Sequence, residues 1–263
     1  MIRSPLMNVM TSTAMKAGKG LRQDFSQIAA LNISKKGPGD FVSQADKRAE
    51  ATIFRELERA RPDYCFVMEE SGVVEGTDKT HRWHIDPLDG TTNFLHGIPI
   101  FAVSIALERE GQIVAGVVYN PITDDLYVAE KGAGAFHNNH RMRVSVCDDP
   151  RDALVGFGLP HIGKSGAALA IREMGAVMGR VGGLRRMGAA ALDLASVANG
   201  QTDGFWERGL SSWDIAAGIV LVREAGGYVS DLKGGDSFLS TGNIVVGTES
   251  VHKELVSVLS KLD

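Results

Sequence analysis

Cysteine is scarce in this sequence, and long apolar runs are absent. Only Cys65 and Cys147 are present, far apart and in no spacing typical of a metal site. This favours free thiols in a reducing compartment, although the sequence leaves a disulfide between them open. No stretch approaches the roughly 18 apolar residues of a membrane span, and residues 1–20 mix Thr, Ser and Lys among apolar residues, unlike a signal peptide. We therefore expect a cytoplasmic protein without a membrane anchor.

An excess of positive charge is also missing. The 28 Lys and Arg residues are outnumbered by 32 Asp and Glu, which gives a net charge of −4. This balance argues against a surface that coats nucleic acid, although a local basic patch stays compatible with it. With 263 residues, 44% of them hydrophobic, the chain can bury a large core as one domain or as two lobes.

Helices and loops dominate the first eighty residues, and strands come after them. An imperfect apolar stripe from Leu6 to Ile28 predicts a helix, and the glycines and proline of residues 35–40 predict a loop. A short strand and a second helix come next, with Ser43 as the expected N-cap and Pro62 just past the end. Successive strands joined by tight turns over residues 82–146 then predict an antiparallel meander.

The second half alternates strands and helices. We therefore place a boundary near residue 147, between an N-terminal α+β lobe (1–147) and a C-terminal α/β lobe (148–263) that pack together as one unit. The expected strands are residues 154–157, 183–186, 203–207, 227–232 and 243–248, and the expected helices are 166–178, 189–198, 214–224 and a closing helix.

Acidic residues gather where the backbone is expected to change direction. "IDPLDGTTNF" (85–94) ends a strand with Asp86, turns at Pro87 and presents Asp89 before Gly90. "MEESG" (68–72) carries two further carboxylates after a short apolar stretch. Asp46 and Asp214 fall in the first turns of predicted helices, where an ordinary capping role is the plainer interpretation of each residue alone.

Taken together, these carboxylates indicate a metal site. Mg²⁺ prefers oxygen ligands, and the carbonyl group of Leu88 inside the turn is a natural further one. Converging carboxylates without a cation would repel one another, whereas with two metals they form a template for displacement at phosphorus. Gly90, Thr91 and Thr92 then offer backbone N–H groups to a phosphate at a helix start. The sequence has no Walker-type loop and no zinc spacing that would favour another site.

The sequence resembles the inositol monophosphatase family of Mg²⁺-dependent, lithium-sensitive phosphatases, and its bacterial extragenic-suppressor type most closely. The likeness runs from about residue 8 to 262 and rests on four motifs. These are "MEESG", "IDPLDGTTNF", "GAAALDLASVANGQTDGFWERG" and "WDIAAGIVLVREAGG". It implies a layered α/β (α+β) sandwich, the sugar-phosphatase fold, with a mainly antiparallel N-terminal sheet and a mixed C-terminal lobe. It also implies a homodimer.

The resemblance also implies roles for individual residues. Glu69, Asp86 and the Leu88 carbonyl would bind the first Mg²⁺, and Asp86, Asp89 and Asp214 the second. A third, weaker Mg²⁺ would lie by Glu69, and Li⁺ would inhibit. The residues implied in catalysis are Thr91, hydrogen-bonded toward Asp46 to orient the attacking water, and Glu70 in support. The residues implied in substrate binding are Asp89, Gly90, Thr91, Gly188, Ala190, Glu207 and Asp214.

The sequence leaves the choice of substrate open. Ala189 stands where animal relatives carry a hydroxyl residue, which removes one polar contact and leaves inositol selectivity undecided. His84, two residues before Asp86, is expected to pack rather than to act in catalysis. The leading hypothesis is an inositol-1-phosphate phosphatase. Histidinol phosphate, fructose 1,6-bisphosphate and 3′-phosphoadenosine 5′-phosphate are alternative substrates, and partnership with the transcription machinery in ribosomal RNA synthesis is an alternative role.

Overall fold

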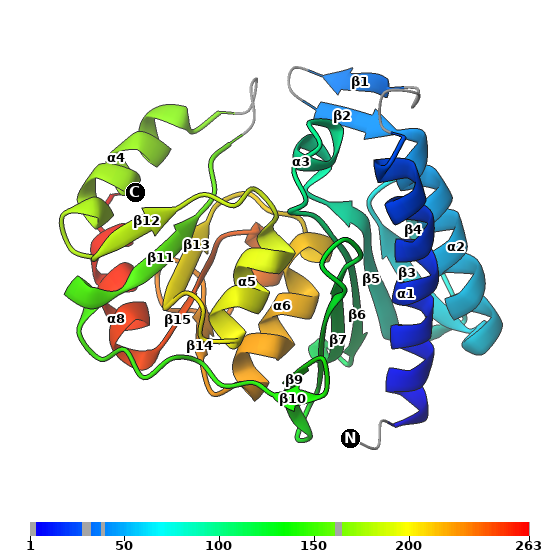
Figure 1. The fold of residues 1–263 in the computed structure, drawn as a ribbon. Helices are drawn as coiled ribbons and strands as arrows, with labels where there is room; N and C mark the ends of the chain where they lie inside the picture. Colours follow the sequence, from blue (N-terminus) through cyan, green and yellow to red (C-terminus); the bar gives the residue numbers. More distant parts are fainter. Residues whose placement is uncertain (1–3, 28–32, 38–39, 161–164, 263) are drawn as a thin grey trace.

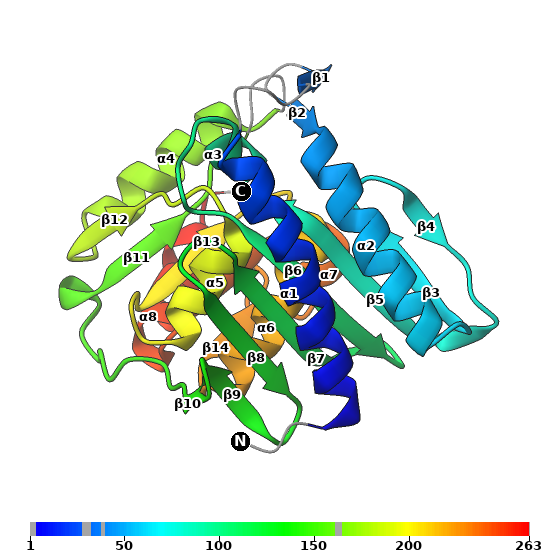
Figure 2. The ribbon, with the colours of Figure 1, turned by 45° about the vertical axis from the view of Figure 1, so that its right-hand side comes forward.

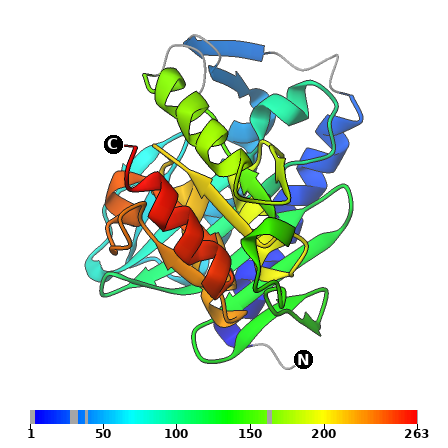
Figure 3. The same cartoon turned by 90° about the vertical axis from the view of Figure 1, so that its left-hand side faces the viewer.

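The structure, a computed structural model, describes residues 4–27, 33–37, 40–160 and 165–262. Helices and sheets alternate in five layers (Figure 1). Helices α1 and α2 cover the outer face of a large sheet, as the turned view shows (Figure 2). Helices α5 and α6 lie between this sheet and a smaller one, whose outer side is covered by α4 and α8 (Figure 3). The layered α/β fold expected from the sequence is confirmed.

The described helices are α1 (Pro5–Phe25), α2 (Gln44–Ala60), α3 (Thr91–Leu95), the 3₁₀ turn η2 (Pro150–Asp152), α4 (Ala167–Met178), α5 (Ala190–Ala198), α6 (Ser212–Glu224), α7 (Phe238–Thr241) and α8 (Glu249–Leu259). None of those described is long and apolar enough to cross a membrane.

The large sheet has eight strands in the order β10-β9-β8-β7-β6-β5-β3-β4. Its pairs are antiparallel except for β3 with β5, so the predicted meander is confirmed. The bounds are β3 (Tyr64–Met68), β4 (Gly72–Val74), β5 (Asp78–Asp89), β6 (Ala102–Arg109), β7 (Gln112–Asn120), β8 (Asp125–Glu130), β9 (Gly134–His137) and β10 (His140–Arg141).

The smaller sheet is mixed, in the order β12-β11-β13-β15-β14. Strand β11 pairs in parallel with β12 and β13, whereas β15 is antiparallel to its neighbours. The predicted boundary at residue 147 falls between the last strand of the large sheet and the first strand of this one. The bounds are β11 (Leu154–Phe157), β12 (Gly183–Arg185), β13 (Gly204–Glu207), β14 (Tyr228–Ser230) and β15 (Ile244–Gly247).

Two local predictions were wrong in part. The expected loop at residues 35–40 contributes to a hairpin of β1 (Ile33–Gly37) and β2 (Asp40–Ser43), with residues 38–39 outside the described part. The expected strand through residue 146 ends at Arg141, because the chain then leaves the large sheet to reach the smaller one. Ile28, the expected last member of the first helical stripe, also lies outside the described residues.

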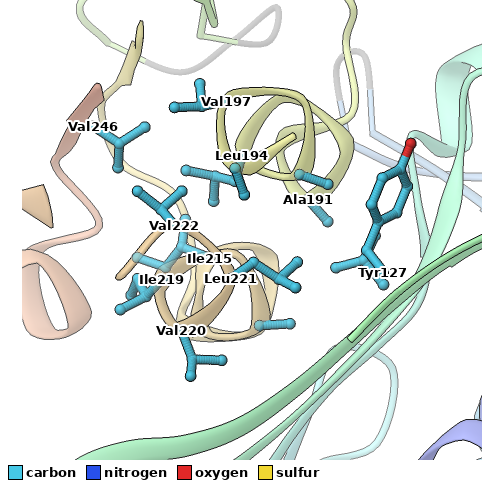
Figure 4. Close-up of a cluster of buried hydrophobic side chains, with 14 of the residues drawn as sticks. Tyr127, Ala191, Leu194, Val197, Ile215, Ile219, Val220, Leu221, Val222 and Val246 are labelled. Atoms are coloured by element: carbon cyan, nitrogen blue, oxygen red, sulfur yellow. The ribbon is translucent and has the colours of Figure 1, made fainter. Parts of the chain in front are cut away.

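The helices between the sheets have no free face. Residues Ile215 to Val222 of α6 are all buried, because α6 packs on the large sheet, on α5 and on β14. Figure 4 shows Leu194 of α5 near Ile215 and Ile219 of α6, within one apolar cluster. A Cβ atom at Gly218 would lie 2.4 Å from Leu194, so the close contact between the two helices requires glycine. This packing fixes where both helices begin.

Both cysteines are free, as expected; Cys65 is buried and Cys147 half-buried.

Candidate active site

A bulge at the end of β5 creates the turn that the sequence singled out. Asp86 lies opposite Ser104 of β6 and Asp89 opposite Ala102, so β5 carries one extra residue between these pairs. Pro87 fits there because a bulge does not need its missing N–H in the ladder. The Asp86 side chain is 2% exposed, and its Oδ1 accepts the Leu88 N–H at 2.9 Å. Both carboxylates are thereby held on one short turn.

Gly90 and Thr91 join this turn to α3. Gly90 has φ of +90°, and a Cβ there would lie 2.8 Å from the Ile100 carbonyl oxygen. Only glycine satisfies both demands. The Thr91 hydroxyl donates to the Leu88 carbonyl oxygen at 3.0 Å. Its single proton is therefore directed to Leu88, while its oxygen can still accept a hydrogen bond.

Asp89 reaches across to the second half of the chain. Its Oδ2 accepts the N–H of Ala191, in the first turn of α5, at 2.7 Å. Burial raises the pKa of Asp89 to about 7, and the charge of Asp214 adds to this, against hydrogen bonds from Ala191, Ala190 and Gly90. The N–H of Ala190, predicted to face the substrate, is thus directed at Asp89.

Asp214 lies in the first turn of α6 and caps it. Its Oδ2 accepts the N–H of Ser211 at 2.7 Å, in a reciprocal capping box. The capping role considered for this residue is therefore present. Its charge nevertheless raises the pKa values of Glu69, Asp86 and Asp89, which places it beside all three carboxylates.

The "MEESG" segment follows β3 and brings Glu69 to the same place. Burial raises the pKa of Glu69 to about 8, with Asp214 and Asp46 contributing, although a hydrogen bond with Asp86 opposes the shift. Asp46, in the first turn of α2, is 1% exposed. Glu70 is half-buried next to Glu69, and its N–H donates to Glu50 at 2.8 Å.

Burial and mutual repulsion together define the electrostatics of the site. Burial raises the pKa of Asp86 well above its ordinary value, and the charges of Glu69, Asp89 and Asp214 act in the same direction. Oxygen atoms alone make up this donor set, which suits a hard divalent cation. Within the described residues, no three such side chains already converge at the distances of a preformed metal centre. The chemistry of these oxygen donors suits a hard divalent cation such as Mg²⁺.

The remaining predicted substrate residues border this region. Gly188 has φ of +82° and precedes α5 by two residues. Glu207 ends β13 and is half-buried, and a Cβ at Gly158 would overlap its carboxylate. Glycine at 158 therefore leaves the space that the Glu207 side chain occupies.

Three residues beside the site were missed by the sequence analysis. Glu50 is 3% exposed and accepts from Glu70 N–H and from Ser71 Oγ. The sequence pattern could have indicated that Glu50 is buried, because Glu50 lies on the same face of α2 as the buried residues Ile53 and Leu57.

Asn93 and Asp193 had no comparable signal. The Asn93 side chain donates to the carbonyl oxygens of Ile100 and Met187 at 2.8 and 2.9 Å, which joins the turn to the segment before α5. Asp193 is 4% exposed, and burial, together with the smaller effects of the charges of Asp89 and Glu207, raises its pKa well above its ordinary value.

Comparison with known proteins gives consistent results. Residues 2–262 match the inositol monophosphatase family. The chain is 57% identical to an inositol-1-monophosphatase of Mesorhizobium japonicum over 261 residues, 99% of this chain and 98% of that protein. It is 44% identical to the Nus factor SuhB of Escherichia coli, covering 96% of this chain and 95% of that protein.

A solved structure is equally similar. The extragenic suppressor protein suhB from Bartonella henselae is 53% identical and superposes with a TM-score of 0.95, covering 98% of this chain and 99% of that one. The chain therefore belongs to the inositol monophosphatase family and is a phosphatase.

Proposed function

We propose that the protein is a Mg²⁺-dependent phosphatase of small polyol phosphates and that inositol-1-phosphate is its main substrate. The observation that supports this most is the group of Glu69, Asp86, Asp89 and Asp214, in which Asp86 is buried and the other three are half-buried. The charge of Asp214 helps to raise the pKa values of the other three carboxylates. Such a group is costly without a cation and favourable with one. The name of the Mesorhizobium japonicum relative supports the choice of substrate.

The proposed ligands are those expected from the resemblance. Glu69, Asp86 and the Leu88 carbonyl would hold one Mg²⁺, and Asp86, Asp89 and Asp214 a second, with a third by Glu69. Bound Mg²⁺ makes water a usable nucleophile near neutral pH and stabilises the negative charge on the leaving oxygen. Li⁺ is proposed as an inhibitor of the same site.

The chain's own residues position the reactants. Gly90 keeps the turn free of a side chain where a phosphate oxygen would lie, and the N–H groups at the start of α3 would face that phosphate. Thr91 donates to Leu88, so its oxygen is left to accept a hydrogen bond from the attacking water. Asp89 and Glu207 are proposed to bind sugar hydroxyls, with Gly188 and Ala190 bordering the substrate. Asp46 and Glu70 would support the shell.

A substrate panel tests this proposal. Purified protein is assayed with inositol-1-phosphate, histidinol phosphate, fructose 1,6-bisphosphate and 3′-phosphoadenosine 5′-phosphate, with and without Mg²⁺ and Li⁺. We expect Mg²⁺-dependent release of phosphate, fastest from inositol-1-phosphate and reduced by Li⁺. Release of no phosphate from any of these esters would refute the proposal.

A second function is proposed because the Escherichia coli relative carries the name Nus factor. The chain would then also bind a protein of the transcription machinery. Purified RNA polymerase with its elongation factors is the appropriate probe, tested against wild type and Asp89→Asn. If both wild type and Asp89→Asn bind, the role is separate from the carboxylates. If neither protein binds, the second function is refuted.

A further inference from the structure

A buried histidine links the large sheet to the start of α6. His84 on β5 is 4% exposed. Its Nε2 lies 2.7 Å from Oε2 of Glu108 on β6, and its Nδ1 lies 2.9 Å from Oγ of Ser212. Ser212 is the first residue of α6, two positions before Asp214. The ring therefore has a polar partner on each side, which packing alone does not require.

Chemistry fixes the direction of these hydrogen bonds. The hydrogen bond from His84 holds the pKa of Glu108 below its ordinary value, so the carboxylate is ionised and can only accept. Nε2 of His84 is then the donor to Glu108. In the neutral ring Nδ1 carries no proton, so it accepts from the Ser212 hydroxyl. With a neutral ring, the Ser212 hydroxyl therefore donates to Nδ1 of His84, and Nε2 of His84 donates to Glu108.

A second bond holds the same turn of α6. Ser104 of β6 is fully buried, and its Oγ donates to the carbonyl oxygen of Trp213 at 3.1 Å. Ser104 is also the residue paired with Asp86 in the sheet. Consecutive residues Ser212 and Trp213 are thus tied to β5 and β6 directly before Asp214.

We propose that His84, whose ring Glu108 orients, and Ser212 form a positioning relay that holds Asp214 at a fixed distance from Asp86. The relay rests on the proposed Mg²⁺ site, since its effect is to keep ligands from both halves of the chain at a fixed separation. His84 is a positioning residue and contacts no reactant. Residues that orient metal ligands typically change metal affinity or activity by about 10–100-fold when removed.

Two amide substitutions separate the two bonds of the ring. The end of an asparagine side chain occupies the place of Nδ1, and that of glutamine the place of Nε2. His84→Asn therefore keeps the contact with Ser212, whereas His84→Gln keeps only the contact with Glu108. We expect His84→Gln to weaken Mg²⁺ binding by about tenfold or more, and His84→Asn by less than about threefold.

Ser212→Ala removes the same bond from the other side and barely disturbs the core. It should match His84→Gln, and the double variant should be no worse than either single one, because both remove one shared interaction. Mg²⁺ affinity is measured by calorimetry, and melting temperature by circular dichroism. The concentration of Mg²⁺ for half-maximal activity should follow the calorimetric values, with the maximal rate changed less.

His137→Asn is the matched control. His137 on β9 pairs with Asp125 at 2.7 Å in the same sheet, and its ring stacks on Tyr127. We expect its Mg²⁺ affinity to equal that of wild type whatever its melting temperature.

The outcomes distinguish a failure of the relay from a failure of the proposed phosphatase function. Wild-type affinity for Mg²⁺ in both His84→Gln and Ser212→Ala would overturn the relay while leaving the phosphatase proposal intact. A wild-type protein that neither binds Mg²⁺ nor releases phosphate would refute the proposed function, and the relay with it.

Discussion

At the scale of single residues, Asp89 serves two purposes that oppose each other in the metal-free protein. Its carboxylate is held by the start of α5, and it is half-buried beside the charge of Asp214. The hydrogen bond stabilises the local structure, whereas the neighbouring charge disfavours the ionised form. The residue is thus suited to a bound cation at the expense of stability without one.

Asp89→Asn should separate these effects. Removing the charge relieves repulsion, so we expect the metal-free variant to melt about 2–4 °C higher, which corresponds to about 1 kcal/mol. Mg²⁺ should no longer raise its melting temperature, and activity should fall by about 100-fold or more. Asp148→Asn, a change of the same charge at an exposed position, should behave like wild type. An Asp89→Asn protein with full activity would show that the ligand assignment is wrong.

Gly90→Ala tests the turn itself. An alanine at position 90 would be strained by the positive φ, and its Cβ would lie too close to the Ile100 carbonyl oxygen. The free energy of unfolding should therefore fall by about 2–3 kcal/mol. Gly97 has φ of +72° with open space around it, so Gly97→Ala should cost only about 1 kcal/mol. Urea unfolding of both variants gives the comparison. Equal losses would mean that the close approach to Ile100 carries no cost.

At the scale of elements, the start of each central helix carries part of the site. Ala191 N–H at the start of α5 holds Asp89, and Asp214 lies at the start of α6. The contact between these helices at Gly218 and Leu194 therefore sets the distance between parts of the site.

Gly218→Ala should disturb this contact. Its Cβ would lie 2.4 Å from Leu194, so we expect a loss of about 1–3 kcal/mol in urea unfolding, together with weaker Mg²⁺ binding. Gly175→Ala in α4 meets nothing within 4 Å and should instead stabilise by up to about 1 kcal/mol. If Gly218→Ala unfolds at the same urea concentration as wild type, the helices are not in fixed contact.

The loop after β14 gives a pH-dependent prediction. Burial would raise the pKa of Asp231, but hydrogen bonds from Ser237, Gly235 and Lys233 outweigh it and lower the pKa to about 2. The folded pKa is below the unfolded value, so this stabilisation is present above about pH 4 and lost as pH falls through about 2. Asp231→Asn should thus be less stable than wild type at pH 7, and the difference should shrink on acidification. A difference independent of pH would contradict this.

At the scale of the whole molecule, the meander of the large sheet and the turn from Asp86 to Gly90 could be predicted because their signals are local. Five adjacent residues, Asp86 to Gly90, define the turn. Successive strand patterns separated by tight-turn residues define the meander. Asn93 depends on a partner 94 residues away, which a linear pattern does not bring together. The hydrogen bond from the Thr91 hydroxyl to the Leu88 carbonyl likewise depends on the geometry of the turn.

The homodimer implied by the resemblance stays a prediction at this scale. Light scattering during gel filtration should give twice the 28.1 kDa mass of one chain. A mass of 28.1 kDa across a range of concentrations would exclude the dimer.

The position of α6 in the chain has a consequence during protein synthesis. The large sheet is complete once Arg141 has been made, yet the helix that covers its inner face begins at Ser212. About seventy further residues must be translated, which takes roughly 4–14 s at typical bacterial and eukaryotic rates. During that interval an apolar sheet face is open to water and to other nascent chains. Exposed apolar surface of this kind makes a folding intermediate prone to aggregation, and formation of α6 removes it.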